Sequence, residues 1–169
     1  MAGSPDEMES ALSSESNESY SARMTAGFCW PWSDPPPDSS LVHDIVINGW
    51  TRPWNVRGER SVGGAPPASL WATDPAGFDQ VGCIYTAQGF EYDWNGVIFG
   101  PDLVRRDGRW MAQPRASKDP ALRAIPDVDA DPLLRNVYKV LLTRGMVGTV
   151  IHSVDPETQA FLAELVSGQ

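Results

Sequence analysis

Two short segments carry the side chains best suited to bind a ligand. The first has the sequence TAQGFE, spans residues 86–91 and follows the apolar run VGCIY. Gly89 would permit a tight turn or a close approach of the backbone to a ligand, and the Glu91 carboxylate could accept hydrogen bonds from sugar hydroxyls. Taken alone, the segment favours a plainer interpretation, a helix N-terminus capped by Thr86 with Glu91 solvated on the first turns.

The second segment, Thr143 to Gly145, joins a helix-like stretch to a strand-like one. An arginine at such a junction can point into a cleft between domains, where its planar guanidinium supplies paired donors to a phosphate. Arg144 could equally lie on the surface and donate to the last carbonyls of the preceding helix. The residues themselves leave both alternatives open.

The elements around these segments alternate between strands and helices. Short apolar runs typical of buried strands occur at residues 81–86, 96–100 and 148–154. Asp107-Gly108 is a favoured two-residue turn and predicts a hairpin over residues 102–112. We therefore expect an α/β fold with a mainly parallel sheet, whose ligands bind at the carboxyl ends of its strands.

Helices are expected after a long polar loop at residues 115–132. Apolar residues at helical spacing predict a helix over residues 133–142, and Asp155 caps a last helix that begins at Pro156. The alternating aspartates of DVDADP lack the glycine and terminal glutamate of a calcium loop, so a solvated acidic loop is the better interpretation of residues 127–132.

The first eighty residues are less regular. Ser4 and Pro5 predict the start of a short helix, which a loop over residues 13–19 follows. Strands are expected at residues 21–28 and 43–50. The tryptophans of this region either form an exposed aromatic patch or pack together at the edge of the core, and we favour packing. These tryptophans are Trp30, Trp32, Trp50, Trp54 and Trp71.

The charge is unevenly distributed along the chain. The net charge is −9, and the first twenty residues contain five acidic residues and no lysine or arginine. We therefore divide the chain into an acidic helix and loop at residues 1–20 and a main domain at residues 21–169. The acidic balance argues against broad nucleic-acid binding, which relies on neutralising several phosphates.

The sequence predicts neither a metal site nor a membrane segment. Cys29 and Cys83 belong to no metal-binding spacing and are expected to be buried thiols, and His152 is expected to be structural. No apolar run is long enough to span a membrane, and the acidic N-terminus does not resemble a secretory signal. We expect a cytoplasmic protein.

Taken in order, the two segments resemble the fifth and sixth motifs of superfamily 1 helicases. TAQGFE is similar to the first motif and VLLTRG to the second, and GFCWPWSDPPP, RPWN and the residues around both motifs extend the likeness. From about residue 5 to its end, the chain resembles the C-terminal half of the Schlafen group 3-type DNA/RNA helicase domain, a family of P-loop NTPases.

The resemblance implies a second RecA-like domain, a three-layer α/β unit that closes over ATP held by a first domain. Gly89 and Glu91 match positions that approach the nucleotide sugar, and Arg144 matches the arginine finger that reaches the γ-phosphate. Thr86 and Gln88 match positions near the nucleic-acid backbone, although the family more often has lysine at Gln88. An arginine on the developing charge can raise the rate of phosphoryl transfer by about 10³ to 10⁵.

The chain lacks the other half of such a site. Lys118 and Lys139 are its only lysines, and neither follows a glycine, so no Walker A sequence is present. We expect ATP and Mg²⁺ to bind only with a Walker A-containing partner chain, and no ATP hydrolysis by this chain alone. The alternatives are a non-catalytic interaction protein and a single-strand DNA or RNA binder that uses aromatic residues with Arg52, Arg57 and Arg60.

Overall fold

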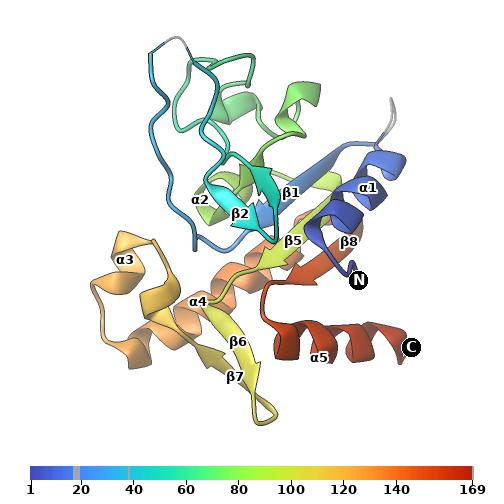
Figure 1. Cartoon of the computed structure of the whole chain (residues 1–169), viewed down its shortest axis with the longest axis vertical. Helices are drawn as coiled ribbons and strands as arrows, with labels where there is room; N and C mark the ends of the chain where they lie inside the picture. Colours follow the sequence, from blue (N-terminus) through green and yellow to red (C-terminus); the bar gives the residue numbers. More distant parts are fainter. Residues whose placement is uncertain (17–19, 38, 169) are drawn as a thin grey trace.

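A sheet of four parallel strands forms the centre of the molecule (Figure 1). The computed structural model describes residues 1–16, 20–37 and 39–168. The strand order is β4-β1-β5-β8, and every pairing between neighbours is parallel. The strands are β1 (Ala22–Ala26), β4 (Val81–Gly82), β5 (Tyr92–Phe99) and β8 (Gly145–Ser153). The predicted α/β fold with a mainly parallel sheet is confirmed.

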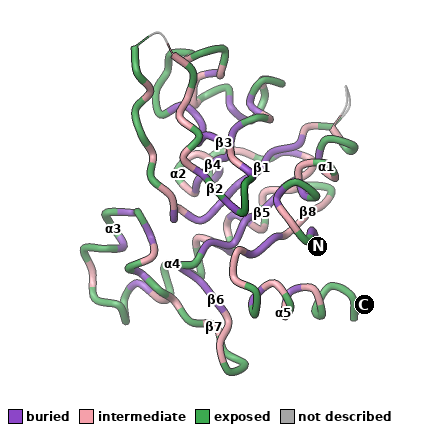
Figure 2. The backbone as a smooth tube through the Cα atoms, in the orientation of Figure 1, coloured by how far each residue is buried: buried purple, intermediate pink, exposed green. Residues whose placement is uncertain are grey.

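Helices cover both faces of this sheet. Successive residues of a strand point to opposite faces, so neighbouring residues of β5 pack against different helices. Gly96 of β5 faces α1 (Pro5–Glu15), where a Cβ atom would lie only 2.7 Å from Leu12 Cδ1. Its neighbour Asn95 faces α4 (Asp127–Leu142) and donates from Nδ2 to the Leu141 carbonyl at 2.8 Å. The result is three layers, with the buried residues concentrated on β1 and β5 (Figure 2).

The N-terminal helix begins as predicted and ends later. Ser4 caps α1 by accepting a hydrogen bond from the Glu7 amide, and Pro5 occupies the first helical position. The helix continues to Glu15, so the loop expected from residue 13 begins later than predicted, and residues 17–19 lie outside the described residues. Met8 and Leu12 of α1 are fully buried, in the same apolar cluster as the sheet.

Two hairpins flank the sheet. The single strand expected at 43–50 is wrong, because Asn48-Gly49 turns the chain between β2 (Ile45–Ile47) and β3 (Trp50–Arg52). Asn48 and Gly49 have φ values of 49° and 92°, the left-handed region that a two-residue hairpin turn requires. The predicted hairpin at 102–112 is confirmed, as β6 (Leu103–Arg106) and β7 (Arg109–Ala112).

Two of the expected elements in the second half are wrong. The strand predicted at 81–86 ends after Gly82, and the chain turns into α2 (Ile84–Ala87). The polar loop predicted at 115–132 is largely helical, and two of its three prolines, Pro120 and Pro126, stand at or next to helix starts. It contains η3 (Pro114–Ala116), α3 (Pro120–Arg123) and the first turns of α4, which holds Pro132 inside the helix.

The remaining segments close the structure. The last helix is α5 (Pro156–Ser167), capped as predicted by Asp155, whose side chain accepts from the Thr158 amide. Two short 3-10 helices, η1 (Ala68–Leu70) and η2 (Pro75–Gly77), lie in the loops before β4. None of the helices in the described ranges is long and apolar enough to cross a membrane.

The tryptophans pack into the protein, as predicted. Trp50, Trp54 and Trp71 are buried, and Trp30 and Trp32 are half-buried against the same core. Trp32 stacks on Trp54 with ring centres 5.5 Å apart. Cys29 and Cys83 are also buried as predicted, and burial raises the pKa of both thiols. Trp50, Trp54 and Trp71 therefore do not belong to an exposed aromatic patch, which was the alternative interpretation.

Candidate functional site

The two segments singled out in the sequence lie side by side in the structure. Tyr92 of β5 is paired with Gly145 of β8, so Glu91 and Arg144 stand next to each other at the starts of the two strands. The Tyr92 amide donates to the Arg144 carbonyl at 3.2 Å, and Arg144 Nη1 donates to the Phe90 carbonyl at 3.5 Å. Strand pairing thus brings together groups that are more than fifty residues apart in sequence.

This position differs in part from the expected one. TAQGFE was expected to follow a strand, but Glu91 follows α2 and lies at the amino end of β5. Arg144 lies between a helix and a strand, as expected, at the end of α4 and the amino end of β8. Both residues are therefore at the edge of the sheet opposite to the carboxyl ends of the strands, where ligands of parallel sheets usually bind.

Arg144 folds back onto the end of α4. Its Nε donates to the Val140 carbonyl at 3.1 Å, and Nη2 donates to Thr143 Oγ1 at 3.3 Å. The contacts of the two terminal nitrogens, at 3.3 and 3.5 Å, are longer than ordinary N–H···O bonds. Arg144 thus donates to the end of the preceding helix, one of the two alternatives expected from the sequence, and only its terminal nitrogens are held by weak bonds that an anionic ligand can replace.

The TAQGFE segment forms α2 and the turn that follows it. Thr86 lies inside α2 and does not cap it, because Cys83 occupies the N-cap position. Thr86 Oγ1 donates to Asn55 Oδ1 at 2.9 Å, and Gln88 is the exposed C-cap. The interpretation of this segment as a helix capped by Thr86 is wrong, since Thr86 is the third residue of α2.

Gly89 does not adopt a conformation that requires glycine. Its φ is not positive, and a Cβ atom there would meet only the Thr86 carbonyl, 4.0 Å away. Gly89 nevertheless lies in a turn, which the Phe90 amide closes by donating to the Ala87 carbonyl at 3.1 Å, and the space above its Cα is open. Glu91, two residues further on, is exposed to solvent.

A groove of about 570 Å³ runs beside α2. Thr86, Gln88 and Gly89 line one side of it, together with Tyr85 and Phe90. The other lining residues come from the loops between β1 and β4. These are Trp32, Asn55, Val56, Arg57, Ala68 and Ser69.

The groove combines aromatic rings with one cation. The Arg57 guanidinium lies over the Trp32 ring, 4.9 Å from its centre. Tyr85 is 55 % exposed, and its hydroxyl donates to Asp119 Oδ2 at 2.7 Å. This hydrogen bond to a carboxylate raises the pKa of Tyr85 to about 12, so the phenol stays protonated. Flat rings beside an arginine are the usual platform for unstacked bases.

Several groove residues were not anticipated from the sequence. Tyr85 and Asn55 were missed, although each adjoins a segment that was singled out, VGCIY–TAQGFE and RPWN. Of the three arginines proposed to bind nucleic acid, only Arg57 lines the groove. Arg52 is instead bound by Glu9, to which its Nε donates at 3.0 Å.

A buried polar network supports the strand ends. The Arg23 guanidinium of β1 is almost completely buried and donates to the carbonyls of Trp71 and Asp74, both at 2.6 Å. Burial lowers the pKa of Arg23. Tyr92 donates from its hydroxyl to Asn95 Oδ1 at 3.1 Å, and burial raises the pKa of Tyr92. These bonds hold β1, β5 and the following loops in fixed positions beneath Arg144.

The described residues contain no group of three or more histidine, cysteine or acidic side chains suited to hold a metal ion. The aspartates of DVDADP lie in the first turns of α4 and not in a loop, and Asp131 binds Arg135 Nε at 2.6 Å. That ion pair lowers the pKa of Asp131. His152 is buried, and its Nδ1 lies 3.3 Å from the Ala2 carbonyl, in agreement with a structural role.

Comparison with known proteins places the chain in a family. Residues 1–155 match the family described as Schlafen group 3, DNA/RNA helicase domain, so the match starts before the residue expected and ends before α5. The chain is also similar to YPL245W, an uncharacterized protein of Saccharomyces cerevisiae, with 30 % identity over 96 residues. That alignment covers 52 % of this chain and 21 % of the yeast protein, so the chain spans about a fifth of its relative's length. No solved structure matches the chain. The protein belongs to the Schlafen group 3 DNA/RNA helicase domain family.

Proposed function

We propose that this domain supplies one half of an ATP site, whose phosphate-binding half is on another polypeptide. The adjacency of Arg144 and the Phe90–Glu91 step carries the proposal. A guanidinium and a carboxylate at the starts of neighbouring strands can contact a phosphate and a ribose of one nucleotide.

Each residue has a chemical role in this proposal. Glu91 accepts hydrogen bonds from the ribose hydroxyls, and the open space above Gly89 lets the sugar approach the backbone. Arg144 leaves its weak bonds to Phe90 and Thr143 and donates to the γ-phosphate, where negative charge develops during hydrolysis. Arg144 is the catalytic residue of this half.

The partner half provides what this chain lacks. A Walker A loop holds the β- and γ-phosphates, and a carboxylate of the same half holds Mg²⁺. This chain has no such loop and no metal-binding cluster among its described residues. It therefore does not hydrolyse ATP by itself.

The groove beside α2 is proposed to bind single-stranded DNA or RNA. Thr86 and Gln88 contact the backbone, while the exposed ring of Tyr85 stacks on a base. The groove and the nucleotide site share the TAQGFE segment. Closure of the two halves on ATP can therefore change the affinity of the groove for the DNA or RNA strand. A domain that binds nucleic acid without completing an ATP site is the second candidate, and the same groove favours it.

A mixing experiment tests the first candidate. The open reading frames next to the gene for this chain are searched for a Walker A sequence, and the protein that such a frame encodes is purified and mixed with this chain. The proposal predicts steady ATP hydrolysis by the mixture and none by this chain alone. If the mixture hydrolyses no more ATP than the partner by itself, only the nucleic-acid candidate remains.

A further inference from the structure

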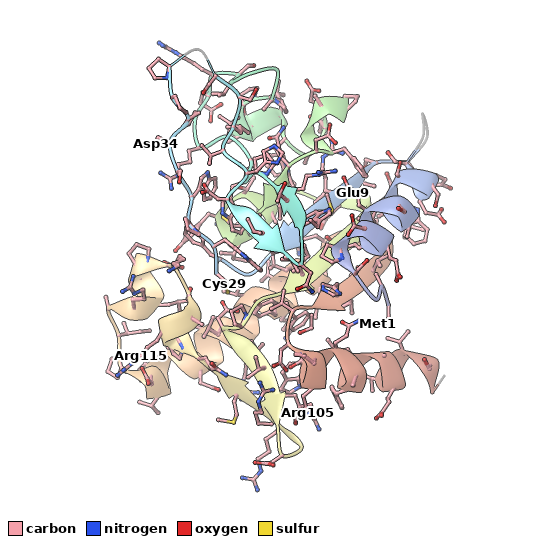
Figure 3. The ribbon with its side chains drawn as sticks, in the orientation of Figure 1. Met1, Glu9, Cys29, Asp34, Arg105 and Arg115 are labelled. Carbon is pink, nitrogen blue, oxygen red and sulfur yellow. The ribbon has the colours of Figure 1, made fainter. Side chains whose placement is uncertain are left out.

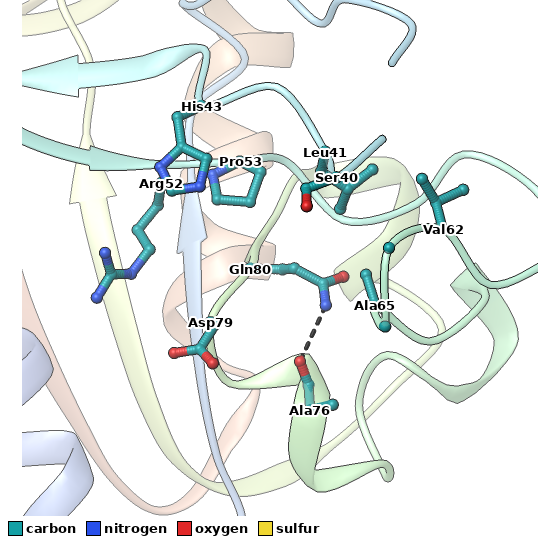
Figure 4. Close-up of a pocket in the computed structure, with 12 residues that line it drawn as sticks. Ser40, Leu41, His43, Arg52, Pro53, Val62, Ala65, Ala76, Asp79 and Gln80 are labelled. Carbon is teal, nitrogen blue, oxygen red and sulfur yellow. Dashed lines mark hydrogen bonds between the residues drawn. The ribbon is translucent and has the colours of Figure 1, made fainter. Parts of the chain in front are cut away.

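A second cavity, of about 440 Å³, lies outside the site described above (Figure 4). It is open to solvent and is lined by three loops, at residues 40–43, 62–65 and 76–80, together with the end of β3. It shares no lining residue with the groove beside α2. The cavity is large enough to enclose a small organic molecule.

Gln80 lies in the middle of this ring of loops. It is only 2 % exposed, and Figure 4 shows its carboxamide between Ala65 and Ala76. Its Nε2 donates to the Ala76 carbonyl at 3.0 Å, but its Oε1 is buried without a hydrogen-bond partner among the described residues. An unpaired buried acceptor is costly, so a ligand that brings an N–H donor to Oε1 recovers a missing hydrogen bond.

The other residues that line the cavity indicate the polarity and charge of a fitting ligand. Asp79 presents an exposed carboxylate at the same wall, a second acceptor. The Arg52 guanidinium is engaged by Glu9, which reduces the attraction of the cavity for anions. Leu41, Pro53 and Val62 provide apolar walls. A fitting ligand therefore has an apolar body and carries N–H and O–H donors rather than negative charge.

We propose that this cavity binds an amino-substituted nucleobase with its sugar, of the adenosine type. The exocyclic amine donates to Gln80 Oε1 after a small rotation of the carboxamide toward the cavity. The ring lies against Leu41, Pro53 and Val62, and the sugar hydroxyls donate to Asp79. The base can come from a free nucleoside or from a nucleic-acid strand. This proposal is independent of the ATP site.

Calorimetric titration of the whole chain tests the proposal with two matched nucleosides. Adenosine is compared with purine riboside, which lacks only the 6-amino group. We expect adenosine to bind at least tenfold more tightly. Gln80→Met, which keeps the length of the side chain without its acceptor, is expected to remove this difference. Asp79→Asn, at an exposed position, is expected to weaken both nucleosides several-fold and gives a readout if Gln80→Met does not fold.

Further measurements distinguish a base of a strand from a free nucleoside, and this cavity from the proposed ATP site. Tighter binding of a hexa-adenylate strand than of adenosine, lost in Gln80→Met, assigns the base to a strand, and equal binding assigns it to the free nucleoside. The difference between adenosine and purine riboside depends on Gln80, which belongs neither to the groove beside α2 nor to the proposed ATP half-site, so a failure of the ATP-site proposal leaves this result intact. Equal affinity for adenosine and purine riboside in the unchanged chain overturns the proposal.

Discussion

Arg144 and Phe90 are joined by a hydrogen bond of 3.5 Å from the guanidinium to the main-chain carbonyl, across 54 residues of sequence. The bond is long, and it links the end of α4 to the turn that follows α2. It therefore connects the two segments without using the full donor capacity of the arginine, which has five N–H groups.

Glu91→Gln should weaken ATP binding without weakening the fold. The carboxylate is exposed, so its loss leaves no buried group unpaired. A hydrogen bond to a charged acceptor contributes about 1.5 to 3 kcal/mol and one to a neutral acceptor, which glutamine keeps, about 0.5 to 1.5 kcal/mol, so we expect the KM for ATP of the reconstituted pair to rise roughly 5- to 10-fold. Steady-state kinetics measure KM, and thermal unfolding of the variant alone is the control. An unchanged KM would remove Glu91 from the nucleotide site.

Tyr85→Ala should weaken single-strand binding in the groove. Stacking of one base on an aromatic ring contributes about 1 to 3 kcal/mol, so the affinity for a short oligonucleotide should fall roughly 5- to 150-fold. Tyr85→Phe keeps the ring and should retain most of the affinity. Fluorescence anisotropy of a labelled oligonucleotide measures both variants. Equal losses in the two variants would mean that the hydroxyl bond to Asp119, and not stacking, is what matters.

The same binding should depend only weakly on salt. Arg57 is the only cationic side chain that lines the groove in the described part of the chain. One neutralised phosphate on a single strand gives a slope of about −0.7 in a plot of log K against log salt concentration. Arg57→Ala should reduce this slope toward zero, whereas Arg109→Ala, on the β6–β7 hairpin, should not. A slope several times steeper would place the strand on another surface.

Gly96→Ala should destabilise the domain, and Gly89→Ala should not. A methyl group at Gly96 would meet Leu12 Cδ1 at 2.7 Å and Met8 Sδ at 2.8 Å, between β5 and α1. Overpacking of this kind costs about 1 to 3 kcal/mol in the free energy of unfolding. At Gly89 the nearest atom is 4.0 Å away. Urea titrations of the two variants make the comparison, and equal stability of both would contradict the packing of α1 on the sheet.

The Asp155–Arg106 pair should make stability depend on pH in the acid range. Arg106 Nη2 lies 2.5 Å from Asp155 Oδ2, and this contact holds the pKa of Asp155 well below its usual value. Since the folded pKa is depressed, the pair contributes its full stability above the ordinary aspartate pKa of about 3.9, and that stability is lost as the pH falls further.

Asp155→Ala should remove this contribution and the cap of α5 together. The loss of a helix cap costs about 0.5 to 2 kcal/mol at neutral pH. The difference in unfolding free energy between the variant and the unchanged chain should shrink as the pH falls from 5 to 2. Urea titrations at several pH values measure it, and a difference that stays constant down to pH 2 would exclude the pair as its source.

Local signals in the sequence are enough to predict much of this fold. Asp155 and Pro156 mark a helix start, and Asp107-Gly108 marks a hairpin turn, because each signal acts within a few residues. The strand expected at 81–86 was wrong, since a short apolar run does not distinguish a strand from a buried helix. The turn at Asn48-Gly49 carried a clear signal that was overlooked.

The residues of the candidate site were proposed from the sequence, but their proximity was not. Glu91 and Arg144 were singled out from the sequence, but only the pairing of Tyr92 with Gly145 determines that they meet. Register between distant strands depends on the packing of the whole sheet, which no local pattern specifies. Asn55 and Tyr85 were missed for the same reason, because the groove forms only when the loops before β4 fold beside α2.

The kcat of ATP hydrolysis by the reconstituted pair, with the unchanged chain and with Arg144→Ala, tests the central claim most directly. Arg144→Lys serves as the matched variant, since it keeps the charge and loses the planar donors. If Arg144 reaches the γ-phosphate, Arg144→Ala should lower kcat by about 10³ to 10⁵ while the two proteins still associate, and Arg144→Lys should recover little of it. A kcat for Arg144→Ala within a few-fold of the unchanged pair would contradict the account.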